Sequence, residues 1–97
     1  MIRRTSLARV SDARRAEKAE YDRARQAAFD RDKCQCQAAR LVTEITCWGV
    51  LDPHHVFSRS RYPERRNDPD ALLTVCRGHH DWIGNNPARA RELGLLA

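Results

Sequence analysis

The pattern of apolar and polar positions divides the chain into a helical first third and a mixed remainder. Strong helix formers without Gly or Pro run from Ala13 to Ala28, and Ser11 and Asp12 before them can cap a helix N-terminus. The apolar positions of this run are mostly Ala, so its apolar stripe is weak. We therefore predict a long helix that needs a partner surface or DNA to be stable.

After residue 32 the pattern changes to short apolar stretches separated by turn residues. The β-branched residues 41–46 predict a short strand, and residues 50–57 predict a second strand in which Pro53 favours an edge position. Residues 58–70 are polar, rich in Arg and interrupted by two Pro, which indicates a loop. The apolar residues 72–75 then return as a strand that leads into Cys76.

Two short helices are predicted at the end of the chain. The first covers His79 to Ile83 and ends at Gly84, and the second begins near Asn86 and Pro87, where Asn caps and Pro takes the first helical position. Together the elements predict a small α+β fold with a hairpin, a loop and a helix, flanked by helices. We expect two parts, a basic N-terminal helical arm over residues 1–32 and a compact domain over residues 33–97.

Composition limits the core and suggests how it is stabilised. With 97 residues, 41% hydrophobic and 32% charged, the domain has a thin core and needs a disulfide or a metal ion. The first 20 residues lack an apolar run of the signal-peptide type, and no stretch is long and apolar enough to cross a bilayer. We therefore expect a cytoplasmic protein without a membrane partner, in which the four Cys stay reduced and bind metal.

The net charge of +5 is concentrated near the N-terminus. Residues 1–33 carry ten Lys and Arg against six acids, whereas the remainder carries eight against seven. An Arg-rich arm favours contact with a phosphate backbone by releasing counterions. The alternative interpretation is an ordinary solvated helix face.

The sulfur ligands predict a structural zinc site. Cys76 and His79 have the two-residue gap of a metal-binding knuckle, and Cys47 is the natural third ligand. Cys36 and Cys34 compete for the fourth position, and we favour Cys36. The alternative is that these thiols are only small buried apolar groups.

The adjacent His54 and His55 predict a second, reactive site. Side chains of neighbouring residues on a strand point to opposite faces, so one ring can bind a metal while the other contacts water. If His54 binds a divalent cation together with His80, then His55 is free to act as the general base for a water that attacks phosphorus. A polar turn is the alternative explanation of the pair.

Three segments, residues 52–60, 66–76 and 79–83, resemble HNH endonucleases of the kind common in bacteriophages and prophages. The resemblance covers residues 31–97 and implies a ββα-metal fold that holds one divalent cation, Mg²⁺, Mn²⁺, Ni²⁺ or Zn²⁺, over the minor groove of DNA. By position it makes His54 and His80 cation ligands and His55 the general base. It implies that the structural zinc is bound by Cys36, Cys47, Cys76 and His79, with His79 where the family usually has Cys.

The chain departs from the family pattern at two positions. Ala71 stands where the family has the Asn of its motif, and Asn67 is a candidate substitute. Gly84 stands where the family has a second helical His. Asn85 or Asn86 could supply a ligand oxygen there, or else Asp52 or water.

These features predict a metal-dependent DNA endonuclease that nicks or cleaves phage or host double-stranded DNA with weak sequence preference. Phosphate contacts are expected from the loop residues Arg59, Arg61, Arg65 and Arg66, unless these belong to an ordinary solvated loop. Further expected partners are phage packaging or recombination proteins in a bacterial cell, with the chain a monomer or dimer. The alternative function is a catalytically silent, zinc-stabilised DNA-binding module.

Overall fold

The computed structural model of the chain describes residues 2–97, with side chains from Ser11 onward. It is a small α+β fold with one two-stranded antiparallel sheet. The elements in chain order are α1 (Ile2–Arg31), β1 (Leu51–His55), the 3-10 helices η1 (Pro63–Arg65) and η2 (Pro69–Ala71), β2 (Leu72–Cys76), α2 (Arg77–Asn85) and α3 (Pro87–Glu92).

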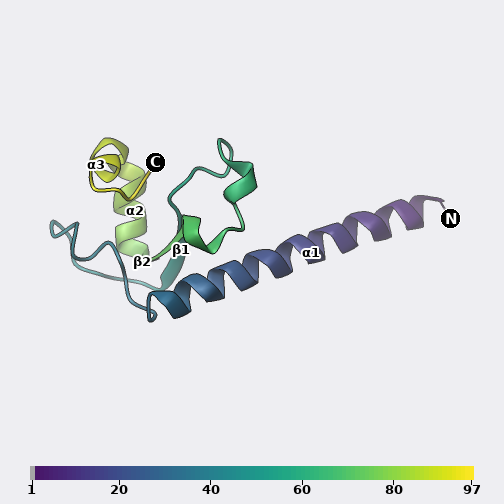
Figure 1. Cartoon of the computed structure of the whole chain (residues 1–97), viewed down its shortest axis with the longest axis horizontal. Helices are drawn as coiled ribbons and strands as arrows, with labels where there is room; N and C mark the ends of the chain where they lie inside the picture. Colours follow the sequence, from purple (N-terminus) through teal and green to yellow (C-terminus); the bar gives the residue numbers. More distant parts are fainter. Residues whose placement is uncertain (1) are drawn as a thin grey trace.

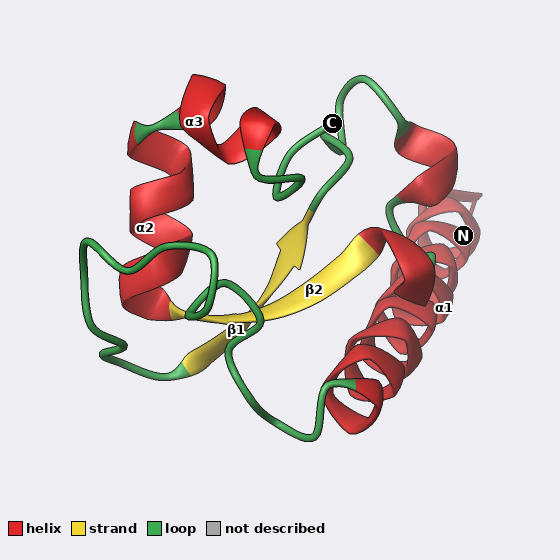
Figure 2. Ribbon diagram, turned by 60° about the vertical axis from the view of Figure 1, so that its left-hand side comes forward, coloured by secondary structure: helices red, strands yellow, loops and turns green. Residues whose placement is uncertain are grey.

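The hairpin of β1 and β2 lies between α1 and α2 (Figure 2). Leu51 pairs with Cys76 at one end of the sheet, and His55 pairs with Leu72 at the other. Because α2 begins directly after β2, its first turn stays next to the Cys76 end of the hairpin. The strand and helix ends that carry the candidate ligands are therefore neighbours.

Two small apolar clusters form the core, one on each side of the hairpin. The larger cluster joins Val75 of β2 to α2, α3 and the segment before β1; it contains Ala38, Val42, Val75, Ile83, Ala90 and Leu95. The smaller joins α1 to the sheet through Ala24, Ala28 and Leu72. Each large apolar side chain buried in this way contributes about 1.5–3 kcal/mol to stability, so the two clusters form the thin core that the composition predicts.

Helix α1 is longer than predicted and projects from the rest of the molecule (Figure 1). The molecule measures 57 × 26 × 21 Å along its principal axes. The last turns of α1 are firmly attached, since the Arg31 guanidinium donates to the carbonyls of Pro69 (2.8 Å) and Leu72 (2.6 Å). Asp32 accepts from the Thr74 backbone N–H at 3.0 Å. The predicted boundary between the helical arm and the domain, at residue 32, thus lies where Arg31 and Asp32 contact the loop and β2.

The predicted strand over residues 41–46 is wrong, because the structure has only turns and bends there. The chain leaves α1 through Lys33 and Cys34, both at a φ of 55°, and the Cys34 N–H closes the helix on the Phe29 carbonyl at 2.9 Å. Val42 is completely buried in the larger cluster. Its β-branched side chain therefore packs in the core from an irregular segment and does not belong to a strand. No helix in the described part of the chain has the length and apolar character needed to cross a membrane.

Candidate functional site

Three thiols and one imidazole converge at the end of the hairpin where α2 begins. The ligand atoms of Cys36, Cys47, Cys76 and His79 all lie within 4.8 Å of one another. Cys36 and Cys47 come from the irregular segment before β1, Cys76 ends β2, and His79 lies in the first turn of α2. This set is a Cys3His group that could hold a metal ion such as zinc.

The His79 ring is oriented as a metal ligand would be. Its Nε2 lies 3.0 Å from the Val42 carbonyl, which can only accept, so Nε2 carries the proton and Nδ1 has a lone pair. Nδ1 lies 3.0 Å from the Cys76 sulfur and 3.5 Å from the Cys47 sulfur. Ligand nitrogen and sulfur atoms around a tetrahedral zinc are about 3.5 Å apart, so these separations fit a shared ion.

Close packing of the segment around Trp48 against α2 places Cys47 in the group. The Gly78 N–H donates to the Trp48 carbonyl at 3.1 Å, and the Arg77 N–H donates to the Val50 carbonyl at 2.9 Å. A Cβ at Gly78 would lie 2.3 Å from the indole nitrogen of Trp48. Only a glycine lets the indole lie directly over the first turn of α2.

The surroundings of the thiols argue against a purely apolar role. Burial alone would raise the pKa of the Cys76 thiol, but the hydrogen bond from the His79 backbone N–H (3.3 Å) favours the thiolate, and the pKa is lowered to about 6. Burial and the neighbouring thiols raise the pKa of Cys47 to about 12, so the two sulfurs differ in how readily they lose a proton. Cys47 is exposed and Cys36 is half-buried, which is unusual for cysteines that only fill a core. Cys34 is exposed and lies outside the group, so the structure brings Cys36 rather than Cys34 to the other ligands.

His54 and His55 face opposite sides of β1. His54 is 4% exposed and lies against His80, with ring centroids 5.4 Å apart. Its Nε2 donates to the Leu95 carbonyl at 2.7 Å, which leaves Nδ1 as the atom with a lone pair. Burial lowers the pKa of His54, so the ring is neutral, as a metal ligand must be.

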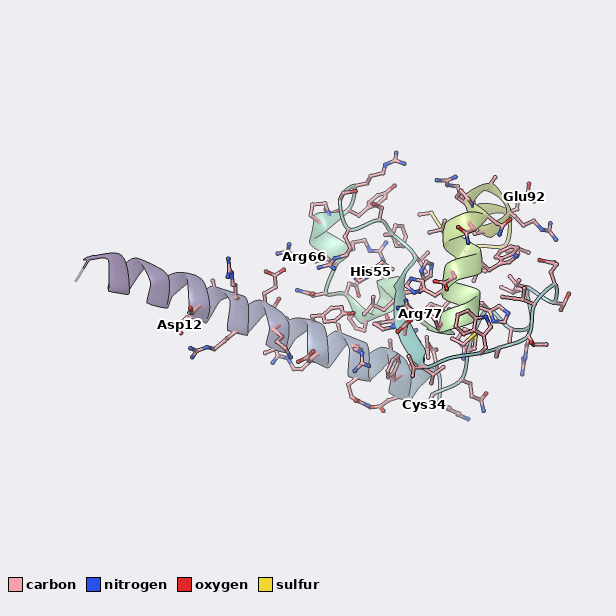
Figure 3. All side chains as sticks on the ribbon, turned by 180° about the vertical axis from the view of Figure 1, so that it is seen from behind. Asp12, Cys34, His55, Arg66, Arg77 and Glu92 are labelled. Atoms are coloured by element: carbon pink, nitrogen blue, oxygen red, sulfur yellow. The ribbon has the colours of Figure 1, made fainter. Side chains whose placement is uncertain are left out.

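His55 lies between α1 and the loop that carries Arg66 (Figure 3). Its Nε2 donates to the Arg66 carbonyl at 3.0 Å, and its ring is nearly parallel to that of Tyr21, with 6.1 Å between centroids. Burial and, to a smaller degree, the positive charge of Arg59 lower the pKa of His55. The ring is thus held in one orientation, neutral, with Nδ1 as the proton acceptor.

Asp52 lies on the same face of β1 as His54. Its Oδ2 lies 3.5 Å from Nδ1 of His80 and 3.2 Å from the Arg77 guanidinium. Both Oδ2 of Asp52 and Nδ1 of His80 are buried without a hydrogen bond. A buried polar atom without a hydrogen bond is costly, and a bound ion or water is one way to satisfy it. Asp52, His54 and His80 are therefore the residues we consider for a cation, although their ligand atoms do not converge as those of the Cys3His group do.

The other predicted cation ligands do not join these three residues. Asn85 follows His80 by five positions, which turns it about 140° around the helix axis. Asn86 is exposed, and its side-chain N–H donates to the Trp82 carbonyl at 2.9 Å. A Cβ at Gly84 would meet nothing within 4 Å, so the position of the missing helical His is open space.

The loop between the strands is tied down without the motif Asn. Ala71 is buried, and its carbonyl accepts from the Val56 N–H at 3.0 Å. Asn67 does not take over this position, because its amide donates to Glu20 on α1 at 3.2 Å. The contacts of Arg31 with the Pro69 and Leu72 carbonyls tie the same part of the loop instead. No local pattern predicts this role for Arg31, since the contacts span 38 and 41 residues.

The four loop arginines have different surroundings. Arg65 lies over the Phe57 ring at 3.9 Å and 3.5 Å from Asp68, and Arg66 pairs with Glu17 of α1 at 3.0 Å. Arg59 and Arg61 are exposed and form no ion pair among the residues that the structure describes. Arg59 and Arg61 are therefore the loop cations that remain available to an external phosphate.

Comparisons of the chain with protein-family models, with curated proteins and with solved structures give no match. Within the described part of the chain, the Cys3His group is the one place where three or more Cys, His or acidic ligand atoms converge. The metal-binding potential of that group is the firmest functional feature of the molecule. Tyr21, which contacts His55, and Arg31 are the neighbours of the site that sequence reasoning did not assign to it.

Proposed function

We propose that this chain is a metal-dependent DNA endonuclease of the HNH type, stabilised by a zinc ion at Cys36, Cys47, Cys76 and His79. The observation that carries the proposal is that the two adjacent histidines of β1 have different surroundings. His54 faces His80 and Asp52 inside the molecule, whereas His55 faces the loop and α1. A ligand and a base on adjacent residues is the arrangement that metal-assisted hydrolysis needs.

In this proposal His55 takes a proton from water. The Arg66 carbonyl holds the proton on Nε2, so Nδ1 is the basic atom of the neutral ring. The water oxygen forms a bond to phosphorus, its proton passes to Nδ1, and the bond from phosphorus to the leaving sugar oxygen breaks. That oxygen gains a proton from solvent, and His55 then releases its proton to solvent. Hydrolysis is complete without any redox partner.

His54, His80 and Asp52 would hold the divalent cation. Nδ1 of His54 has a free lone pair, and the buried Asp52 oxygen and His80 nitrogen lack hydrogen-bond partners. A mixed nitrogen and oxygen set suits Mn²⁺, Ni²⁺ or Zn²⁺, and with solvent ligands also Mg²⁺. When bound, such a cation supplies charge stabilisation for the phosphate and the leaving oxygen.

The substrate proposal, double-stranded DNA with weak sequence preference, follows from the charged groups around His55. Arg59 and Arg61 are exposed on the loop, and guanidinium groups match phosphate oxygens by paired hydrogen bonds. Phosphate contacts position a protein on DNA but read no bases. No motif of the sequence resembles a base-reading recognition helix, so sequence preference is expected to be weak.

A second candidate is a catalytically silent, zinc-stabilised DNA-binding module. Two observations favour it: Gly84 offers no ligand, and among the described residues no second group of three ligand atoms converges. Both candidates share the Cys3His group and the exposed loop residues Arg59 and Arg61. They differ in whether His55 acts on water.

A plasmid-nicking assay separates the two functions. Zinc-loaded protein is incubated with supercoiled plasmid and Mg²⁺, Mn²⁺ or Ni²⁺, alongside His55→Ala and the control Asp81→Asn, an exposed change on α2. The endonuclease predicts open-circular product with the wild type and the control, and a loss of at least about 100-fold in His55→Ala. Plasmid that is bound but left supercoiled by all three proteins supports the silent module.

A further inference from the structure

Two hollows lie along α1 where it faces the loop between the strands. One has a volume of about 560 Å³, and its charged lining residues are Glu20, Arg23, Glu64 and Asp68. The other has a volume of about 340 Å³ and is lined by Arg14, Glu17, Lys18, Tyr21, Arg59 and Asn67. The first, which we term the acidic hollow, has three acids and one cation. The second, the basic hollow, has three cations and one acid.

Within residues 11–97, ion pairs leave two cations of the basic hollow without a partner. Glu17 of the basic hollow is paired with Arg66 at 3.0 Å, so its negative charge is already compensated. Lys18 is paired with Asp22 at 2.8 Å. Arg14 and Arg59 form no ion pair among the described residues, and both are exposed. Two guanidinium groups, one from α1 and one from the loop, are thus available to an anion.

The helix period explains why these residues share a hollow. Arg14, Lys18 and Tyr21 are spaced by four and three positions, so they lie on one face of α1. The Glu17–Arg66 pair joins that face to the loop and keeps Arg59 opposite it. The basic hollow is therefore a defined surface of the folded domain rather than a property of a separate arm.

Tyr21 connects the basic hollow to His55. The Tyr21 ring lines the hollow, and it is also nearly parallel to the His55 ring, at 10° between planes and 6.1 Å between centroids. An anion seated between Arg14 and Arg59 would consequently be separated from the proposed general base by the Tyr21 ring. The anion that we expect there is a phosphate of a bound DNA strand, next to the phosphate that is presented to His55.

We propose that the basic hollow binds a phosphodiester group of double-stranded DNA, next to the one presented to His55, through Arg14 and Arg59. The assignment of the neighbouring phosphate rests on the proposed endonuclease function. The hollow is open and lined by polar side chains, whereas sites for free small molecules are usually enclosed and mostly apolar. A polymer backbone passing over the surface fits this shape, and bidentate guanidinium contacts fit its phosphates.

Binding without cleavage tests this proposal. The zinc-loaded protein is titrated into a fluorescent duplex of about 20 base pairs without added divalent cation, at several salt concentrations, for the wild type, Arg14→Ala and Arg59→Ala. The matched control is Arg23→Ala, which removes the same charge from the same helix but lines the acidic hollow. We expect several-fold weaker binding for Arg14→Ala and Arg59→Ala, with the slope of log affinity against log salt reduced by about one in each. Arg23→Ala should leave both quantities close to the wild type.

Three results would overturn the proposal: unchanged slopes in Arg14→Ala and Arg59→Ala, an equal loss in Arg23→Ala, or equal affinity for an RNA duplex of the same length. The second would show that only overall charge matters. The nicking assay reports separately on the proposed function. If the wild type never nicks plasmid while the two variants lose affinity as stated, the endonuclease is rejected and the phosphate site stands.

Discussion

Nδ1 of His80 lies 3.5 Å from Oδ2 of Asp52, and both atoms are buried without a hydrogen bond. Adjacent ligands around an octahedral cation such as Mg²⁺ are about 3 Å apart, so a small inward movement would let both contact one ion. The Arg77 guanidinium, 3.2 Å from the same oxygen, balances the carboxylate charge. Asp52 thus occupies a position at which either Arg77 or a cation can compensate it.

Replacing Asp52 should weaken cation binding more than it weakens the fold. We predict that Asp52→Asn, which keeps the size of the side chain, lowers Mn²⁺ affinity at least about tenfold, because a charged oxygen ligand is lost. The measurement is calorimetric titration of zinc-loaded protein with Mn²⁺, with Asp81→Asn as the control for loss of an acid. Equal affinities in all three proteins would remove Asp52 from the site.

Gly84 provides a test by gain of function. The position is open, with nothing within 4 Å of a Cβ, and it lies four residues after His80 on the same face of α2. We predict that Gly84→His supplies an imidazole to the candidate cation site and raises both Mn²⁺ affinity and the nicking rate. Gly84→Ala is the control, since it changes the backbone propensity without adding a ligand. A Gly84→His variant that behaves like Gly84→Ala in both assays would argue against a cation near His80.

Metal binding by the Cys3His group should determine whether the domain folds. We predict about one tightly bound zinc per chain by mass spectrometry, and loss of both zinc and cooperative unfolding in Cys76→Ser, because a thin core cannot replace the metal. Cys34→Ser is the matched control, because Cys34 is exposed and outside the group. A folded, metal-free wild type would reject the structural zinc.

Two glycines of α2 should respond in opposite directions to the same change. Gly78→Ala places a methyl group against the Trp48 indole, and forcing the indole away should cost about 1–3 kcal/mol and weaken zinc binding through Cys47. Gly84→Ala adds a methyl group in open space and should stabilise the helix by about 0.5–1 kcal/mol. Thermal unfolding of the two variants measures both effects. Equal melting temperatures would show that the Trp48 contact does not constrain the domain.

Much of the fold follows from local patterns in the sequence. Pro87 at the first helical position predicted α3, and the apolar residues 72–75 predicted β2. The spacing of Cys76 and His79, with Cys36 and Cys47 upstream, predicted a group of ligands that the structure does bring together. These features depend on residues a few positions apart, or on ligand chemistry that restricts the choice of partners.

What could not be predicted depends on contacts between distant segments. Residues 41–46 have strand-forming residues, yet Val42 is used to fill the core and its carbonyl to orient His79, 37 residues away. The ties of Arg31 to the loop and of Tyr21 to His55 likewise arise only when α1 packs against β2. Side-chain periodicity gives no information on which face of a weakly amphipathic helix finds such partners.

The central claim is that adjacent imidazoles on β1 have separate functions. It is tested most directly by electron paramagnetic resonance of Mn²⁺ added to zinc-loaded wild type, His54→Ala and His55→Ala. We predict that the wild type and His55→Ala each bind Mn²⁺, whereas His54→Ala leaves the ion free in solution. Free Mn²⁺ with the wild type, or binding that is lost in His55→Ala but kept in His54→Ala, would contradict the account.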